Sequence, residues 1–192
     1  MVAGPSGSGK SRLAARLRLP VLNLDDFYRS AGDPALPRLP GGLVDWDTPS
    51  SWLQDEAVAA IEELCRSGRV DVPVYDISRD GRVGHQVLEL AGSELFVAEG
   101  IFAQEVVGDC LSRELVADAI CVTQHPAVTF WRRLTRDLRE HRKPPLVLVR
   151  RGLRLAREQR SVVAHAVALG CTPLTPDAAH ARIRCLVDGA RR

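Results

Sequence analysis

Lysine is nearly absent from this 192-residue chain, since it occurs only at positions 10 and 143 among 26 lysines and arginines. Long apolar runs are also missing, and none approaches the roughly 20 residues that a membrane-spanning helix needs. The first residues have neither the basic nor the apolar region of a signal peptide, so we expect a cytoplasmic protein without membrane contact. The net charge of +2 is too close to neutral to favour nucleic acid as a partner.

Cysteines with the spacing of a metal site are missing as well. The five that occur, at positions 65, 110, 121, 171 and 185, form no C-x-x-C pair and no cysteine-histidine pattern. We therefore expect small buried side chains in a reducing compartment. With 45% hydrophobic and 26% charged residues, the chain has the composition of a globular protein, and its length predicts one domain over residues 1–192. A homo-oligomer stays open.

Strand and helix patterns alternate along the chain, which predicts an α/β fold with a mostly parallel sheet covered by helices on both faces. The turn residues Asp80 and Gly81 separate two strand patterns and predict a hairpin that projects from this sheet. The expected strands are residues 21–24, 72–75, 83–90, 95–99 and 119–122, and the expected helices are residues 10–17, 48–64, 104–115, 126–140, 145–168 and 176–187.

A glycine-rich segment near the start of the chain matches the phosphate-binding pattern G-x-x-x-x-G-K-[ST], between a short apolar strand and a helix. Glycines let successive N–H groups point inward at phosphate oxygens, and the helix N-terminus adds partial positive charge. Lys10 is then expected to reach the terminal phosphates of ATP, and Ser11 to ligate Mg²⁺. The alternative is a flexible glycine turn. The segment is Gly4, Pro5, Ser6, Gly7, Ser8, Gly9, Lys10 and Ser11.

Three acidic residues follow predicted strands and are candidates for phosphoryl-transfer chemistry. A carboxylate beside the phosphate loop can orient an acceptor hydroxyl and draw off its proton, which makes Asp25 and Asp26 candidates for a general base. Asp26 can equally cap the loop that follows it. Glu99 ends an apolar run and is a candidate to hold Mg²⁺ through a water molecule, with a solvated strand end as the alternative.

Six basic residues lie on or just after the helix expected from Pro126, where Trp131, Leu134 and Leu138 are expected to face the core. Two or three of them are expected to stabilise charge on the transferring phosphoryl group, and the others to form a solvated face. The six are Arg132, Arg133, Arg136, Arg139, Arg142 and Lys143. Aromatic residues in candidate pocket loops, either stacking on a ligand or packing, are Tyr28, Trp46, Tyr75 and Phe102.

Several ordered blocks give the chain a resemblance to the uridine kinase branch of the uridine kinase and phosphoribulokinase family. They are the glycine-rich loop, Leu24-Asp25-Asp26-Phe27-Tyr28-Arg29, Asp45-Trp46-Asp47-Thr48-Pro49, Pro73-Val74-Tyr75-Asp76 with Arg82, Glu99-Gly100-Ile101, and Arg132-Arg133-Leu134-Thr135-Arg136-Asp137. The resemblance implies a P-loop NTPase fold with a doubly wound sheet, a small β-hairpin and a helical lid at about residues 126–144. It covers about residues 1–143.

The resemblance also implies an activity, namely transfer of a phosphoryl group from ATP, with Mg²⁺, to the 5′-hydroxyl of uridine or cytidine. It makes Asp25 the base, Asp47 a ribose contact, Tyr75 and Arg82 nucleoside contacts, and Arg133 and Arg136 the lid cations. With Tyr28, which was singled out above as an aromatic residue, Asp25, Asp47, Tyr75 and Arg82 are the expected substrate-binding residues.

Three departures from the family pattern leave other functions open. Asp80 stands where uridine kinases usually carry a base-reading histidine, and a lid glycine is replaced around His141 and Arg142. No last strand is evident after Pro144, where the sequence reads mainly helical. The alternatives are a P-loop kinase for another metabolite, such as a pantothenate-like or sugar-phosphate acceptor, and an ATP-binding regulator that has lost productive transfer.

Overall fold

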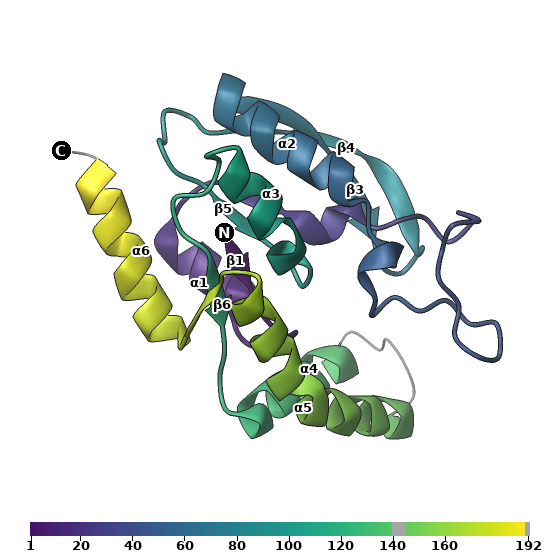
Figure 1. Ribbon diagram of the computed structural model, residues 1–192. Helices are drawn as coiled ribbons and strands as arrows, with labels where there is room; N and C mark the ends of the chain where they lie inside the picture. Colours follow the sequence, from purple (N-terminus) through teal and green to yellow (C-terminus); the bar gives the residue numbers. More distant parts are fainter. Residues whose placement is uncertain (140–144, 191–192) are drawn as a thin grey trace.

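The centre of the molecule is a five-stranded parallel sheet, drawn from the computed structural model in Figure 1. The structure describes residues 1–139 and 145–190, without the side chains of residue 133 and residues 136–156. Every neighbouring pair of strands in the sheet is parallel, which confirms the expected α/β fold. The strand order is β2 (Val21–Asn23), β5 (Val97–Glu99), β1 (Val2–Ala3), β6 (Ile120–Val122) and β7 (Thr172–Leu174).

One face of the sheet is covered by α1 (Lys10–Leu17) and α6 (Pro176–Ala190). Side chains alternate between the two faces of a strand, so every second residue of the sheet reaches this layer. Val2, Val97 and Ile120 pack here in one apolar cluster with residues of both helices.

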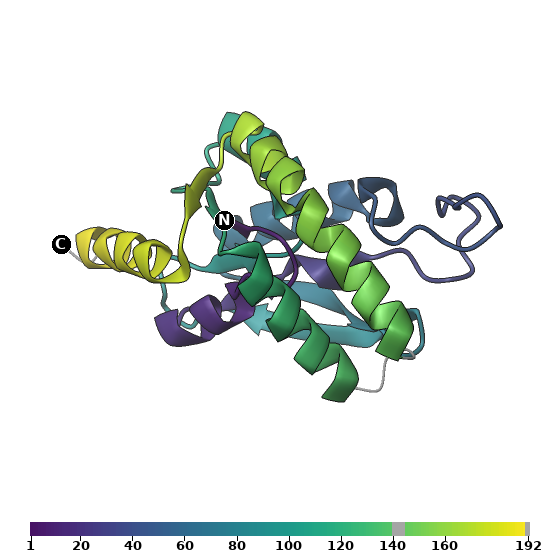
Figure 2. The same ribbon diagram turned by 90° about the horizontal axis from the view of Figure 1, so that it is seen from below.

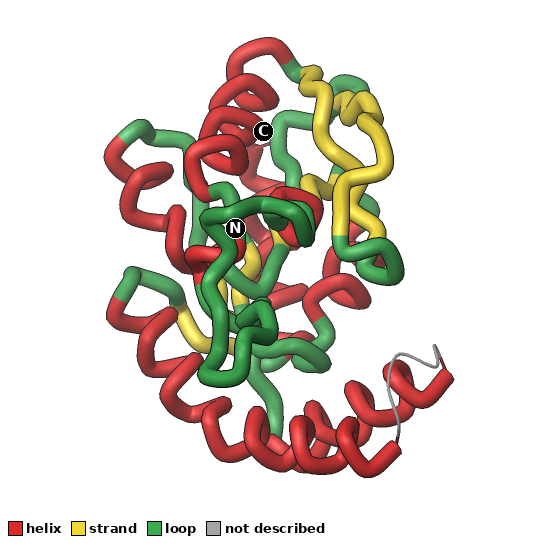
Figure 3. The backbone as a smooth tube through the Cα atoms, turned by 90° about the vertical axis from the view of Figure 1, so that its right-hand side faces the viewer, coloured by secondary structure: helices red, strands yellow, loops and turns green. Residues whose placement is uncertain are grey.

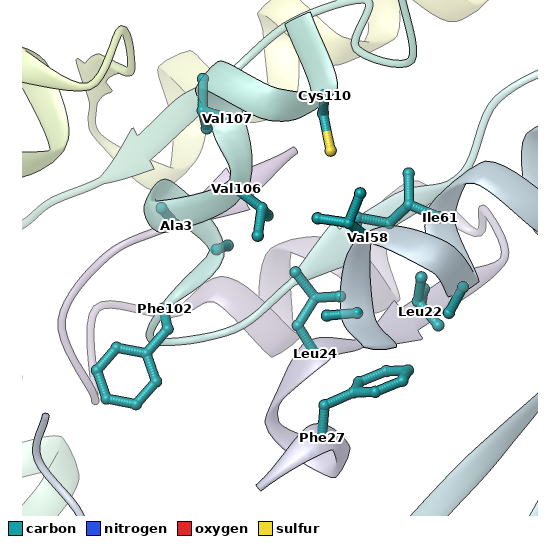
Figure 4. Packing of buried hydrophobic residues seen from close by; sticks show 14 of the residues in the cluster. Ala3, Leu22, Leu24, Phe27, Val58, Ile61, Phe102, Val106, Val107 and Cys110 are labelled. Atoms are coloured by element: carbon teal, nitrogen blue, oxygen red, sulfur yellow. The ribbon is translucent and has the colours of Figure 1, made fainter. Parts of the chain in front are cut away.

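The opposite face is covered by α2 (Gln54–Ser67), α3 (Val107–Ser112) and part of α5 (Pro145–Ala168). Ala3 and Ala98, the neighbours of Val2 and Val97, belong to this second and larger cluster. Figure 4 shows its packing, with side chains from α2, α3 and the sheet pointing toward one another. Both faces of the sheet are thus buried, as expected for parallel strands.

Two further parts project from this layered body. The antiparallel hairpin of β3 (Arg69–Asp76) and β4 (Gly81–Glu89) confirms the strand pair expected around Asp80. The helices α4 (Pro126–Arg139) and α5 lie side by side in Figure 2. Figure 3 shows the hairpin and this helix pair at opposite ends of the molecule. No helix in the described ranges has the length and apolar character needed to cross a bilayer.

Two secondary-structure expectations are wrong in detail. The helix expected from Thr48 begins at Gln54, because Thr48 precedes a separate 3-10 turn, η2 (Pro49–Ser51), and Trp52 is extended with its indole donating to the carbonyl of Leu24 over 2.6 Å. A last parallel strand does exist after residue 144. It is β7, where the N–H of Thr172 donates to Ala119, and it escaped the sequence reading because three residues around a proline show no apolar period.

Expectations about burial also needed correction. Trp131 was expected to face the core but is 62% exposed. Cys65 and Cys185 are exposed, because they lie on solvent faces of α2 and α6, whereas Cys110, Cys121 and Cys171 are buried as expected. All five are free thiols.

Candidate active site

The glycine-rich loop runs from the carboxyl end of β1, the central strand, into the first turn of α1. Gly4 has a φ of +137°, and a Cβ there would collide with the carbonyl oxygen of Val122, so no other residue fits. Lys10 is buried at the helix start, where its Nζ donates to the carbonyl of Gly4 over 2.8 Å. The ammonium group is therefore folded back over the loop.

Glu99 meets this loop from the end of β5, next to β1 in the sheet. It is 6% exposed, and its Oε1 accepts a hydrogen bond from the hydroxyl of Ser11 over 2.6 Å. Burial raises the pKa of the Glu99 carboxyl, although the charge of Lys10 and the hydroxyl of Ser11 act in the opposite direction. The reading of Glu99 as a solvated strand end is wrong.

Asp25 lies in the short 3-10 helix η1 (Leu24–Phe27) that follows β2. Its Oδ1 accepts a hydrogen bond from the backbone N–H of Ile101 over 2.8 Å. Gly100 makes this possible, because a Cβ there would lie 2.9 Å both from Oδ1 of Asp25 and from the Cβ of Leu24. The carboxylate is thus fixed against the segment that follows Glu99.

Asp26 points elsewhere and has a structural role. Its Oδ1 accepts from the backbone N–H of Tyr75 over 3.2 Å, and its Oδ2 accepts from the side-chain amide of Asn23 over 2.8 Å. Burial raises the pKa of the Asp26 carboxyl. Of the two adjacent acids, Asp26 joins the hairpin to the sheet, and Asp25 lies against the loop after Glu99.

Tyr28 lies at the centre of an aromatic cluster. Its ring centroid is 5.9 Å from that of Trp46, 5.7 Å from that of Tyr75 and 5.9 Å from that of Phe102. These distances are typical of packed aromatic pairs. The four aromatic residues singled out in the sequence are therefore gathered in one place.

Two predicted substrate contacts come from the hairpin. The hydroxyl of Tyr75 donates to the carbonyl of Arg29 over 3.4 Å, and burial raises the pKa of Tyr75 to about 12. Arg82 is the cross-strand partner of Tyr75, and its Nη2 lies 2.7 Å from a carboxylate oxygen of Glu56. The buried Nε of Arg82 has no hydrogen-bond partner among the described residues.

One of the six basic residues, Arg132 on α4, reaches the glycine-rich loop. Its Nη1 lies 3.4 Å from the point where a Cβ of Gly9 would be. The sequence named Arg132 among six basic residues but gave preference to Arg133 and Arg136. These two fall on α4, and their side chains lie outside the described ones.

A cavity of about 390 Å³ opens beside the start of the loop. Asp47, another predicted substrate residue, lies in its lining together with Gly4, Phe102, Glu105, Thr129 and His165. The sequence had assigned no role to Glu105, Thr129 or His165. No local sequence pattern marks these three residues, because they come from three distant parts of the chain and meet only in the folded protein.

The residues at the loop fit a magnesium-bound nucleoside triphosphate. Gly9 is the N-cap of α1 and has no side chain to occupy the first free N–H groups of the helix, which leaves them for phosphate oxygens. The Ser11 hydroxyl and the Glu99 carboxylate are oxygen ligands of the kind that Mg²⁺ prefers. Among the described residues there is no cluster of three or more His, Cys, Asp or Glu side chains that would hold a metal alone.

Residues 38–143, more than half of the chain, match the phosphoribulokinase / uridine kinase family. The chain belongs to this family. It is 32% identical over 144 residues to a uridine kinase of Schizosaccharomyces pombe, a match that covers 71% of this chain and 31% of the relative. It is 30% identical over 164 residues to a uridine kinase of Deinococcus deserti, covering 81% and 76% of the two chains. The chain therefore spans about a third of the length of the fission yeast relative.

A solved structure has the same fold. It is the putative fructose transport system kinase from Silicibacter sp. TM1040, which matches with a TM-score of 0.60 over 85% of this chain and 82% of its own. The sequence identity is 22%, so this similarity supports the P-loop kinase fold and nothing finer.

Proposed function

We propose that this protein is an ATP-dependent kinase that phosphorylates a hydroxyl group of a small molecule, with the 5′-hydroxyl of uridine or cytidine as the acceptor. The observation that carries the proposal is the meeting of Lys10, Ser11, Glu99 and Asp25 where parallel strands end. In open α/β sheets, ligands bind outside the carboxyl ends of the strands. Membership of the family and the uridine kinases among the relatives support the choice of acceptor.

Each residue of this group has a distinct task. Lys10 and the N–H groups of the loop bind the terminal phosphates, and Ser11 and Glu99 hold the metal ion. When bound, Mg²⁺ supplies positive charge next to the phosphate oxygens. Asp25 orients the acceptor hydroxyl and takes its proton, because the amide of Ile101 fixes the carboxylate in one position.

The acceptor and the lid involve residues further from the loop. Asp47 is proposed to contact the ribose, Tyr28, Tyr75 and Arg82 to contact the nucleoside, and Arg133 and Arg136 to act as lid cations. We also propose that residues 1–192 form one cytoplasmic kinase domain whose lid is at about 126–144, of which 140–144 lie outside the described residues.

The test is release of ADP from ATP and Mg²⁺ against a panel of uridine, cytidine, pantothenate and sugar phosphates. We expect release with the pyrimidine nucleosides. Asp25→Asn should lower kcat by about two to four orders of magnitude, because an amide does not accept the proton. The matched control is Asp71→Asn on the exposed face of β3, which should keep its turnover. Binding of ATP without ADP release for any acceptor would identify a regulator instead.

A further inference from the structure

The hairpin of β3 and β4 is a two-stranded sheet, so each strand has one edge that pairs with no other strand. The two edges differ in how they are occupied. Along the edge of β3, the N–H of Tyr75 donates to the Asp26 carboxylate over 3.2 Å, and Pro73, two residues earlier, has no N–H to offer. Proline and occupied backbone groups protect an edge strand from pairing with a further strand. The edge of β3 is therefore closed.

The register of the hairpin identifies the backbone groups on the edge of β4. Because the N–H of Tyr75 donates to Asp26, it points away from β4, and every second residue along an antiparallel strand points the same way. The β4 partners of these alternate β3 residues also direct their backbone groups outward, and they are His85, Val87 and Glu89. Among the described residues, no backbone hydrogen bond from outside the hairpin reaches these three. The edge of β4 is therefore open.

This open edge lacks the features that usually keep edge strands apart. Residues 83–88 include no lysine, arginine, aspartate, glutamate or proline. Residues 83–87 are all exposed, and the hairpin lies at one end of the molecule (Figure 3). Val87, in the middle of the three outward-directed residues, is 50% exposed although its side chain is apolar. The edge thus offers both unpaired backbone groups and an apolar contact.

The open edge does not extend to the turn of the hairpin. The ladder is irregular at Val83, which the register passes over, and next to it the N–H of Arg82 donates to the hydroxyl of Ser30 over 3.2 Å. A bulge of this kind bends the strand and interrupts regular pairing. The segment that can pair with another strand therefore runs from His85 to Glu89.

We infer that β4 pairs with β4 of a second copy of this chain, antiparallel, with Val87 opposite Val87 on a two-fold axis. In this register His85 of each copy lies opposite Glu89 of the other, so an imidazole meets a carboxylate on both sides of the valine pair. The product is a four-stranded sheet whose outer strands are the two copies of β3. Because Tyr75 and Pro73 close those outer edges, the pairing ends at two copies.

The test is the mass of the full chain in solution, measured by analytical ultracentrifugation over a series of concentrations. So short a pairing segment gives a small interface, and we expect a transient dimer in equilibrium with the monomer. Val87→Lys and Val87→Glu should each raise the dissociation constant at least about tenfold, because the residue on the axis meets its own copy and like charges repel. An equimolar mixture of the two variants should dimerise again, since lysine then faces glutamate.

The matched control is Val83→Lys, on the same strand and exposed to a similar extent, 47%. It has no partner in this register, so its dissociation constant should stay within about threefold of the wild type. Circular dichroism checks that each variant is folded. If Val87→Lys is not, His85→Pro gives the same comparison, because it removes one outward N–H and leaves the ladder with β3 intact.

Three results would each overturn this pairing: a wild type that stays monomeric at every concentration, an equal loss of association in Val83→Lys, or no dimer in the mixture of the lysine and glutamate variants. The pairing does not depend on the proposed function, because ADP release plays no part in the measurement. An inactive protein that dimerises in this register would reject the kinase and keep the interface.

Discussion

The carboxyl group of Asp26 is hydrogen-bonded and half-buried, so its contribution to stability depends on pH. Both of its oxygens accept hydrogen bonds, from Tyr75 and Asn23, yet burial raises its pKa above the ordinary value of 3.8. The Asp26 carboxyl therefore binds a proton more tightly in the folded state than in the unfolded state. The stability from this group is present below pH 3.8 and is lost as the pH rises through the higher pKa of the folded state.

We therefore expect the difference in unfolding free energy between the wild type and Asp26→Asn to depend on pH. The amide loses no proton, and its altered contact with Asn23 adds only an offset that is constant with pH. From pH 3.8 upward the wild type should lose stability relative to the variant until its carboxyl is fully ionised. Urea denaturation at a series of pH values from about 3 to 7 measures this. If the unfolding free energies of the wild type and the variant change with pH in the same way, burial does not raise the pKa of Asp26.

For single residues, the sequence predicted a role where a residue type suited to the chemistry stands within a motif or directly after a strand. Lys10 and Ser11 were predicted from their spacing, and Asp25 and Glu99 from their place after strands. Arg132 was not distinguished from the other basic residues of its helix, because its position next to Gly9 comes from the tertiary structure. The same holds for Glu105, Thr129 and His165, which meet at the cavity only in the folded chain.

Helices α4 and α5 are joined by a buried hydrogen bond between two polar side chains. Thr129 on α4 and Gln159 on α5 form a hydrogen bond of 2.5 Å between them. Thr129→Val takes the donor away from the buried Oε1 of Gln159. Gln159→Leu takes the donor away from the carbonyl of Gln124, although the Thr129 hydroxyl still lies 2.8 Å from the carbonyl of Pro126. The hydrogen bond between the two side chains can be lost only once, whichever residue is changed first.

We predict that Thr129→Val and Gln159→Leu each lower the unfolding free energy by about 1–3 kcal/mol, and that the double variant loses less than the sum. Thermal or urea denaturation of the four proteins gives the coupling energy. Thr135→Val, on the exposed side of α4, is the matched control, and we expect a change within about 0.5 kcal/mol. Strict additivity would mean that the two side chains do not act as a pair.

Helix positions were predicted well where proline marks the start and apolar residues recur at helical spacing. The ranges expected for α5 and α6 agree with the structure to within three residues. Strand β7 was missed because Thr172, Pro173 and Leu174 carry no period of their own. Its place is set by pairing with β6, which is a long-range property.

For the whole molecule, the two apolar clusters lie on opposite faces of one thin sheet. Leu64 of α2 belongs to one cluster and Leu13 of α1 to the other, and both are almost fully buried. Strands only two or three residues long cannot remain ordered without helices on both sides. Loss of either layer should therefore unfold the other.

We predict that Leu64→Ala and Leu13→Ala each lower the unfolding free energy by about 2–5 kcal/mol, and that each variant unfolds in one cooperative transition. Circular dichroism and intrinsic tryptophan fluorescence should give coincident urea curves. Two separate transitions in either variant would contradict a single domain. A matched exposed change, Leu111→Ala on α3, should cost much less.

Strand β1 consists of Val2 and Ala3, whose side chains enter the two clusters, and Gly4 follows immediately. No spacer separates the hydrophobic interior from the first peptide group of the phosphate loop. Repacking on either side of the sheet therefore displaces the nucleotide site directly. Selection for nucleotide affinity would in this way also constrain residues that never approach a ligand.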